Sequence, residues 1–241
     1  MTDQNIQIRL EGVQLRIIEA CKCYDRDPDS VLLLAVSKTK PLNMVEIAMT
    51  CGQKHFGENY LQDALDKISS SSGDKAIWHF IGAIQSNKTR QIADHFDWVH
   101  TVSSLKIARR LNEQRSSKLP PMNILIQVNI DEEENKSGIM PDHLEGLVAE
   151  ILPLTKDSDR IRLRGLMAIP LKDQTANVSP STTNAFSRLA SLRAELATKF
   201  GLEDFDQLSM GMSADLDLAI EAGSTIVRVG TDIFGPRGSN I

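Results

Sequence analysis

The sequence has few cysteines and no long apolar segment. Its 241 residues include three cysteines, an odd number that does not suggest a disulfide framework and is typical of a reducing cytosol. No stretch approaches the ~18 apolar residues of a membrane-spanning helix, and the first ten residues lack the apolar core of a signal peptide. We therefore expect a cytoplasmic protein that has no membrane partner.

Positive charge is also scarce. The chain has 27 Lys and Arg against 32 Asp and Glu, a net charge of −5. Nonspecific nucleic-acid binding needs a broad basic surface, so we expect no polynucleotide partner, although a local basic pocket for one anion is still allowed. The sequence also contains no metal-ligand constellation, no Walker loop and no Ser/His/Asp signature. We therefore expect no metal site.

What the sequence does contain is a regular alternation of strand-like and helical segments. Strand-like runs occupy residues 31–36, 55–59, 78–82, 98–103, 123–130, 161–169, 207–212 and 225–230. Helical patterns lie between them, over 43–51, 60–70, 88–95, 105–117, 141–152, 182–200 and 214–222. Apolar runs such as 124–126 are continuous, as in parallel strands that are covered on both faces. This alternation predicts an α/β fold with a parallel sheet.

Eight such units can close into a barrel or form an open sheet, and periodicity alone does not distinguish the two. Only residues 231–241 follow the eighth strand, too few for a full helix, whereas residues 1–24 have helical spacing. We infer that this leading helix completes the ring. No linker composition divides the chain, and the polar segment 173–184 is interpreted as a surface loop. The prediction is a (β/α)8 TIM-like barrel, with residues 1–241 as a single domain.

Two features follow predicted strands at the end where such barrels place their active sites. Lys38 comes directly after the first strand. A solvent-exposed lysine is the commoner interpretation, and the alternative is a partly desolvated amine that can form a Schiff base. The Gly-rich segment 223–235 is consistent with a tight turn or with a phosphate site at Thr231. A second segment of small and hydroxyl residues, 209–213, favours phosphate.

Arg228 lies between two valines in the last predicted strand. A guanidinium in an apolar strand needs a partner, because an unpaired buried charge costs several kcal/mol. The partner is either a carboxylate such as Asp215 or Asp217, or an acceptor on a bound ligand. His79 and His100 also lie in strand-like segments, and we interpret them as hydrogen-bonded core residues.

Several motifs together resemble one known family. They are Ala35-Val-Ser-Lys-Thr-Lys40, Phe56-Gly-Glu-Asn-Tyr60, Trp78-His-Phe-Ile-Gly82, Leu208-Ser-Met-Gly-Met-Ser213 and Gly223-Ser-Thr225. In this order they are similar to the motifs of the pyridoxal-phosphate homeostasis protein family, and the resemblance extends from the first strand to Arg237. Members of that family resemble the N-terminal barrel of alanine racemase and hold pyridoxal 5′-phosphate (PLP) as an internal aldimine.

The resemblance implies one cofactor, PLP, and assigns a role to residues at the strand ends. Lys38 would be the Schiff-base lysine, and Arg228 would face the pyridine nitrogen. The phosphate would be held by Ser209, Gly230 and Thr231, with Met210 supplying backbone or wall contacts, and Asn59 and Ile81 would line the surroundings of the cofactor. The chain departs from the family pattern at Asp217 and Asp232, neither of which touches the lysine or the phosphate loop.

The implied site favours binding over turnover. An arginine facing the pyridine nitrogen gives up no proton, so the cofactor is a poorer electron sink than one paired with an aspartate. The second base of alanine racemase is a tyrosine from an extra domain and a partner subunit, whereas this chain has only Tyr24 and Tyr60. We expect a monomeric PLP carrier or buffer in vitamin B6 and amino-acid homeostasis, without catalytic residues. PLP-dependent apoenzymes would be its transient partners.

Two other classes of function remain as alternatives. One is a PLP-dependent amino-acid racemase-type enzyme, with Tyr60 or a histidine as its second base. The other is a protein-interaction module, whose cellular role would not depend on the cofactor.

Overall fold

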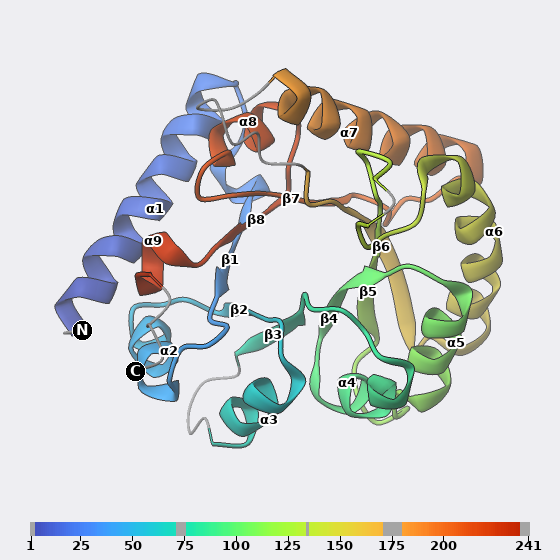
Figure 1. Ribbon diagram of the computed structural model, residues 1–241, viewed down its shortest axis with the longest axis horizontal. Coiled ribbons are helices and arrows are strands. Elements are labelled where there is room, and N and C mark those ends of the chain that lie inside the picture. Colours follow the sequence, from blue (N-terminus) through green and yellow to red (C-terminus); the bar gives the residue numbers. More distant parts are fainter. Residues whose placement is uncertain (1–2, 71–75, 134, 171–179, 237–241) are drawn as a thin grey trace.

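The strands close into a barrel. A computed structural model describes residues 3–70, 76–133, 135–170 and 180–236. Its eight parallel strands follow one another around the barrel in sequence order, and β1 pairs with β8 to close it (Figure 1). They are β1 (Leu32–Val36), β2 (His55–Glu58), β3 (Ile77–Phe80), β4 (Trp98–Val102), β5 (Met122–Gln127), β6 (Ile161–Met167), β7 (Gln207–Met212) and β8 (Ile226–Val229). The predicted α/β barrel is confirmed.

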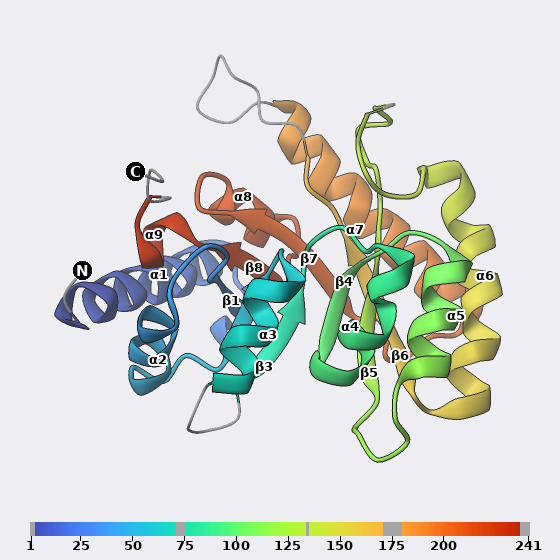
Figure 2. The ribbon, with the colours of Figure 1, turned by 60° about the horizontal axis from the view of Figure 1, so that its bottom comes forward.

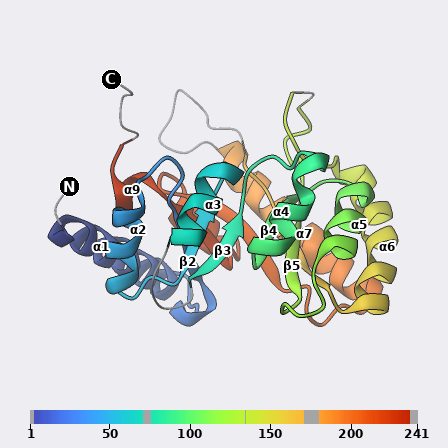
Figure 3. The same ribbon diagram turned by 90° about the horizontal axis from the view of Figure 1, so that it is seen from below.

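Helices surround the barrel on its outside. They are α1 (Asp3–Cys23), α2 (Leu42–Thr50), α3 (Leu61–Ser70), α4 (Thr89–His95), α5 (Leu105–Gln114), α6 (Pro141–Ser158), α7 (Pro180–Phe200), α8 (Leu216–Glu221) and α9 (Thr231–Phe234), with short 3-10 turns at Pro28–Ser30 and Ser86–Lys88. Helices α3 to α6 stand in succession along the outer wall, as Figures 2 and 3 show. Within the described residues, none of these helices is long and apolar enough to cross a membrane.

The leading helix completes the ring as predicted. Helix α1 packs against α8, α9 and α2 and closes the part of the wall where no full helix follows β8. Its inward side chains share the helical spacing seen in the sequence and are buried: Ile6, Leu10, Val13, Ile17 and Ala20. Arg16 fixes the helix further, because its guanidinium bonds to the carboxylate of Asp217 on α8 and to the carbonyl of Ser213.

Helices α6 and α7 differ from their predicted bounds. The predicted end of α6 at Leu152 is wrong, since the helix continues through Pro153 to Ser158. Pro153 is exposed, so the backbone carbonyl that its ring leaves unbonded can face water, while Leu152 and Leu154 pack against the core. Helix α7 begins at Pro180, so residues 180–184 are helical rather than part of the predicted loop 173–184. Residues 173–179 lie outside the described residues.

Two apolar layers stabilise the barrel. The larger layer lies between strands and helices, and a smaller cluster of Leu34, Leu125, Met167 and Ile226 comes from β1, β5, β6 and β8. Strands β1 and β5 are not neighbours, so contacts in this cluster are made across the barrel interior. The remaining interior space holds buried polar residues, among them His79, His100, Ser209 and Arg228.

Gly165 allows β6 to approach β7 closely. Its φ is +150°, and a Cβ added there would lie 1.9 Å from the carbonyl oxygen of Gln207. We expect Gly165→Ala to lower the free energy of unfolding by about 3 kcal/mol, because backbone strain and overpacking add. Gly146→Ala is the matched control: Gly146 lies in α6 with open space around it, so stability should rise by up to ~1 kcal/mol. Urea denaturation measures both, and equal effects would contradict the role assigned to Gly165.

Candidate functional site

A cavity of about 240 Å³ lies at the C-terminal ends of the strands. We call it the ligand cavity. Its lining includes most of the residues singled out from the sequence, namely Lys38, Asn59, Ile81, Arg228, Gly230 and Thr231. Val36, Met167, Ile169, Met212, Ser213 and Ala214 complete it. The ends of β1, β2, β3, β6, β7 and β8 therefore meet where the sequence places the site.

Ser209 and Met210 do not line this cavity. Ser209 is fully buried, and its hydroxyl oxygen lies 2.7 Å from Nη1 of Arg228 and 2.9 Å from Nδ1 of His100. Met210 is buried in the layer between barrel and helices. After β7 the lining comes instead from Met212, Ser213 and Ala214. The phosphate role of Ser209 and the wall role of Met210 stay predictions, and the geometry gives Ser209 a second role as a partner of Arg228.

A buried ammonium group lies beneath the turn that carries Lys38. Nζ of Lys67, on α3, donates to the backbone carbonyl of Ser37 at 2.9 Å and to Oε1 of Glu58 at 2.7 Å. The hydroxyl of Ser37 donates to the same Glu58 oxygen at 2.6 Å. Lys67, Glu58 and Ser37 are each at most 3% exposed. The residue before Lys38 is therefore held by a buried ion pair through both its backbone and its side chain.

The residue after Lys38 is held by the same group of side chains. Thr39 has a φ of +62°, in the left-handed region that non-glycine residues seldom occupy. Its backbone N–H donates to Oδ2 of Asp63 at 3.3 Å, and the same oxygen accepts from Lys67 at 2.9 Å. Through Asp63, Lys67 thus also restrains the strained end of the turn. We call Ser37, Thr39, Glu58, Asp63 and Lys67 the lysine brace.

Sequence reasoning did not find the lysine brace. Glu58 belongs to one of the quoted motifs but was given no role, and Lys67 was not singled out. Two signals were present: Glu58 is a carboxylate inside a predicted strand, directly after Phe56 and Gly57, and Asp63 and Lys67 are four residues apart on a helix. Burial raises the pKa of Glu58, while Lys67 and Ser37 act to lower it. Oε2 of Glu58 is buried without a hydrogen-bond partner among the described residues.

Arg228 has neutral partners rather than a carboxylate. Nη1 donates to the carbonyl and hydroxyl oxygens of Ser209 at 2.6 and 2.7 Å, and Nη2 donates to the carbonyl of Ala168 at 2.9 Å. Desolvation lowers the pKa of Arg228 to about 10, although the charge of Asp215 opposes this effect. The guanidinium therefore remains charged at neutral pH.

Of the two alternatives left open for Arg228, the ion pair with Asp215 or Asp217 does not form among the described residues. Asp217 binds Arg16 of α1, and Oδ1 of Asp215 accepts from the backbone N–H of Met212 at 2.6 Å. Asp215 thereby shapes the loop after β7, and Arg228, which lines the ligand cavity, hydrogen-bonds instead to the buried oxygens of Ser209 and Ala168.

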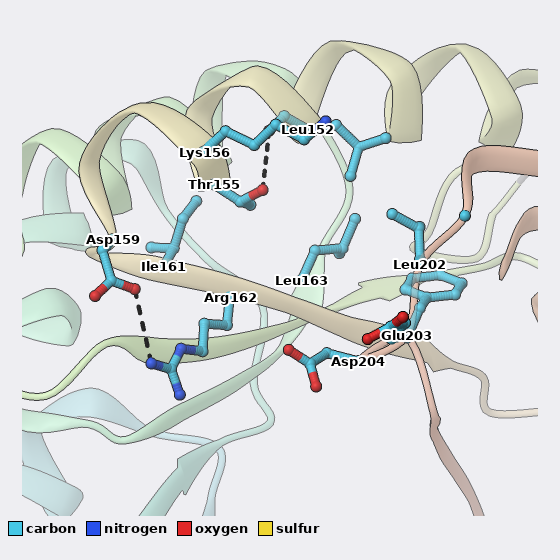
Figure 4. Close-up of a pocket in the computed structure, with 12 residues that line it drawn as sticks. Leu152, Thr155, Lys156, Asp159, Ile161, Arg162, Leu163, Leu202, Glu203 and Asp204 are labelled. Carbon is cyan, nitrogen blue, oxygen red and sulfur yellow. Dashed lines mark hydrogen bonds and ion pairs between the residues drawn. The ribbon is translucent and has the colours of Figure 1, made fainter.

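A larger groove, of about 560 Å³, lies near the start of β6, at the opposite end of the strand from the ligand cavity. It is bounded by the end of α6, the start of β6 and the segment before β7, as Figure 4 shows. Its charged residues include Asp159 and Arg162, an exposed pair 3.7 Å apart. It contains none of the residues predicted to carry chemistry. Within the described residues, no group of His, Cys, Asp and Glu is arranged to hold a metal ion.

Comparison with known proteins identifies the family. Residues 25–238 match the family described as alanine racemase, N-terminal domain. The pyridoxal phosphate homeostasis protein of Pseudomonas aeruginosa is 51% identical over 93% of both chains. That of Haemophilus influenzae is 47% identical over 97% of this chain and 96% of its own length. The structure of PipY from Synechococcus elongatus with PLP bound superposes with a TM-score of 0.79, at 33% identity, covering 95% of this chain and all of PipY. The chain therefore belongs to the pyridoxal phosphate homeostasis protein family, within the alanine racemase N-terminal domain family.

Proposed function

We propose that this chain binds PLP in the ligand cavity and carries or buffers it in vitamin B6 and amino-acid homeostasis. The observation that carries the proposal is the meeting of Lys38, Arg228, Gly230 and Thr231 around one cavity. Relatives that match nearly their full length are named PLP homeostasis proteins, and the related PipY structure holds PLP. The whole chain, residues 1–241, acts as one cofactor-binding domain in this proposal.

The residues of the ligand cavity fit the groups that PLP presents. Asn59 belongs to the cavity lining, and its Oδ1 is a buried acceptor without a hydrogen-bond partner among the described residues. A Cβ at Gly230 would lie 3.1 Å from the carbonyl oxygen of Val36. Glycine at this position therefore leaves the backbone of the cavity wall uncovered by a side chain. Gly230 and Thr231 would hold the phosphate with backbone N–H and hydroxyl groups. Arg228 would face the pyridine nitrogen.

Bound PLP supplies an aldehyde that an amine can attach to reversibly, and Lys38 is the amine we assign. The lining favours storage over turnover. Lys38 and Arg228 are the titratable side chains among the described residues that line the cavity. Arg228, with a pKa of about 10, donates hydrogen bonds and holds its proton at neutral pH. The racemase alternative needs Tyr60 or a histidine as its second base. Tyr60 is 58% exposed, and the cavity lining includes neither Tyr60 nor a histidine.

The finer parts of the proposal concern cellular context. We propose that the protein acts as a monomer in the cytoplasm and that apoenzymes in need of PLP are its transient partners. A reversible covalent bond to Lys38 would keep the concentration of free PLP aldehyde low and would still permit PLP to be released. A carrier requires both properties.

The first test replaces the proposed attachment lysine. Lys38→Ala should abolish the visible absorbance that PLP gives when bound to an amine, and borohydride reduction should leave no labelled peptide. Lys40→Ala is the matched control, because Lys40 lies two residues away and instead donates to the carbonyls of Gly235 and Pro236. Absorbance and peptide mapping distinguish the two variants. An adduct on another lysine, or a wild-type protein that takes up no PLP, would contradict the proposal.

The lysine brace gives a second test. Lys67→Met removes the cation that holds Ser37 and Asp63 and leaves Glu58 buried as an unpaired carboxylate. The free energy of unfolding should fall by about 3 kcal/mol, and PLP affinity should fall as well because the Lys38 turn is no longer held. Lys199→Met is the control: Lys199 pairs with Glu145 but both are 56% exposed, so stability should change by at most ~0.5 kcal/mol.

The double variant Glu58→Gln/Lys67→Met distinguishes the effect of Lys67 on the Lys38 turn from its effect on the free energy of unfolding. It removes both buried charges, so much of the stability should return, whereas the carbonyl of Ser37 and the carboxylate of Asp63 still lack their donor. PLP affinity should therefore stay low. Urea denaturation and absorbance titration with PLP measure the two quantities, and full recovery of affinity in the double variant would show that Lys67 serves stability alone.

A further inference from the structure

A row of three imidazoles crosses the barrel interior. His55, His79 and His100 come from the neighbouring strands β2, β3 and β4. Nδ1 of His55 lies 2.9 Å from Nε2 of His79, and Nδ1 of His79 lies 2.9 Å from Nε2 of His100. The middle ring is stacked on Trp98 with an interplanar angle of 7°. We call these residues the histidine row.

The histidine row connects the two ends of the barrel. At one end, Nδ1 of His100 lies 2.9 Å from the hydroxyl oxygen of Ser209, which is 2.7 Å from Nη1 of Arg228 in the ligand cavity. At the other end, His55 is the first residue of β2 and lines a separate cavity of about 390 Å³ together with Gln53 and Lys54. A continuous chain of hydrogen bonds therefore runs from the N-terminal end of the barrel to Arg228.

The imidazoles of the row are neutral at physiological pH. Burial lowers the pKa of His79 and of His100 well below the ordinary value, and nearby charge acts in the same direction, since Arg228 faces His100. Burial, with Lys54 nearby, also lowers the pKa of His55. A neutral imidazole has one N–H donor and one acceptor nitrogen. Each ring therefore donates on one side and accepts on the other, so the row has a direction.

Arg228 sets that direction. A guanidinium only donates, so the hydroxyl oxygen of Ser209 accepts from Nη1. If the row pointed toward Ser209, the oxygen would accept from His100 as well, and the hydroxyl hydrogen would have no acceptor within the described structure. A buried donor without an acceptor is destabilising. The favoured direction is therefore the opposite one: Ser209 donates to Nδ1 of His100, and His100, His79 and His55 each carry their proton on Nε2.

We propose that the three histidines are positioning residues for Arg228. By accepting the hydroxyl hydrogen of Ser209, the row turns the oxygen lone pair toward the guanidinium and so fixes Arg228 at the ligand cavity. The inference rests on the proposed function only for the identity of the ligand that Arg228 meets. The direction of the row is a property of the protein without ligand.

The direction can be tested by two substitutions of equal size at Ser209. Nitrogen-15 NMR of the histidine rings, on protein without PLP, should give the Nε2–H tautomer for all three residues. Ser209→Asn retains an acceptor for Arg228 and a donor for His100, so the tautomers should stay. Ser209→Asp has acceptors alone as a carboxylate, so His100 must donate to it, and His79 and His55 should reverse in turn to Nδ1–H.

Reversal at His79 and His55 is the decisive result, because neither ring touches Ser209. A wild-type row with Nδ1–H or charged rings, or a Ser209→Asp variant that changes His100 alone, would overturn the inference. The wild-type spectrum is a sufficient test if either variant fails to fold.

The consequence for the ligand is measured separately. His79→Leu interrupts the row without touching the ligand cavity, and it should weaken PLP binding about tenfold, as substitutions along a coupled network do. Leu111→Ala is the control for lost packing, since Leu111 is buried on α5 in the outer apolar layer and does not line the ligand cavity; it should lower stability without changing PLP affinity. Unchanged affinity in His79→Leu would remove the positioning role. A wild-type protein that binds no PLP would instead contradict the proposed function, and the tautomer result would still hold.

Discussion

The barrel interior is organised by the need to solvate one buried cation. Arg228 lies on β8 with its guanidinium away from water, and a charge in that position must be compensated by hydrogen bonds or an opposite charge. The compensation comes from oxygens of Ser209 on β7 and of Ala168 directly after β6. These bonds join three adjacent segments of the barrel. Since none of the partners is a carboxylate, the guanidinium keeps its positive field at the ligand cavity, where it can act on a bound acceptor.

A second buried cation, Lys67, is compensated in a different way. Its ammonium binds the carboxylates of Glu58 and Asp63 and the carbonyl of Ser37, outside the barrel and under α3. The ion pair neutralises the charge, so Lys67 adds little field to the site. Its effect is geometric, because the bonds converge on the residues that flank Lys38. The two cations therefore differ in their proposed effect: Arg228 would act on the ligand by its charge, whereas Lys67 holds the turn that carries Lys38.

The barrel and much of the site followed from local patterns in the sequence. Continuous apolar runs alternating with helical spacing identified parallel strands. The last strand and the strand ends made Arg228, Lys38 and the Gly230–Thr231 turn candidates, and the family resemblance assigned their roles. The end of α6 was missed because Pro153 usually stops a helix, whereas here it faces solvent. The lysine brace was missed although two of its signals were present, because the contact between them depends on how α3 packs over β2 and the turn after β1. The histidine row joins residues more than twenty positions apart, and only the register between neighbouring strands brings the rings into contact.

Ser209 was selected from the sequence as a phosphate ligand, but its contacts in the structure are with Arg228 and His100. It lies one residue before Met210, and side chains of a strand alternate between its two faces. Met210 packs outward under the helices, so Ser209 points inward to Arg228 and His100. The loop after β7 then supplies the cavity through Met212, Ser213 and Ala214. A phosphate accepts hydrogen bonds, so it would compete with Nδ1 of His100 for the hydroxyl hydrogen of Ser209, whose oxygen already accepts from Arg228. In the proposed function, backbone N–H groups and Thr231 would therefore be the stronger phosphate donors, and Ser209 would act on the ligand chiefly by fixing Arg228.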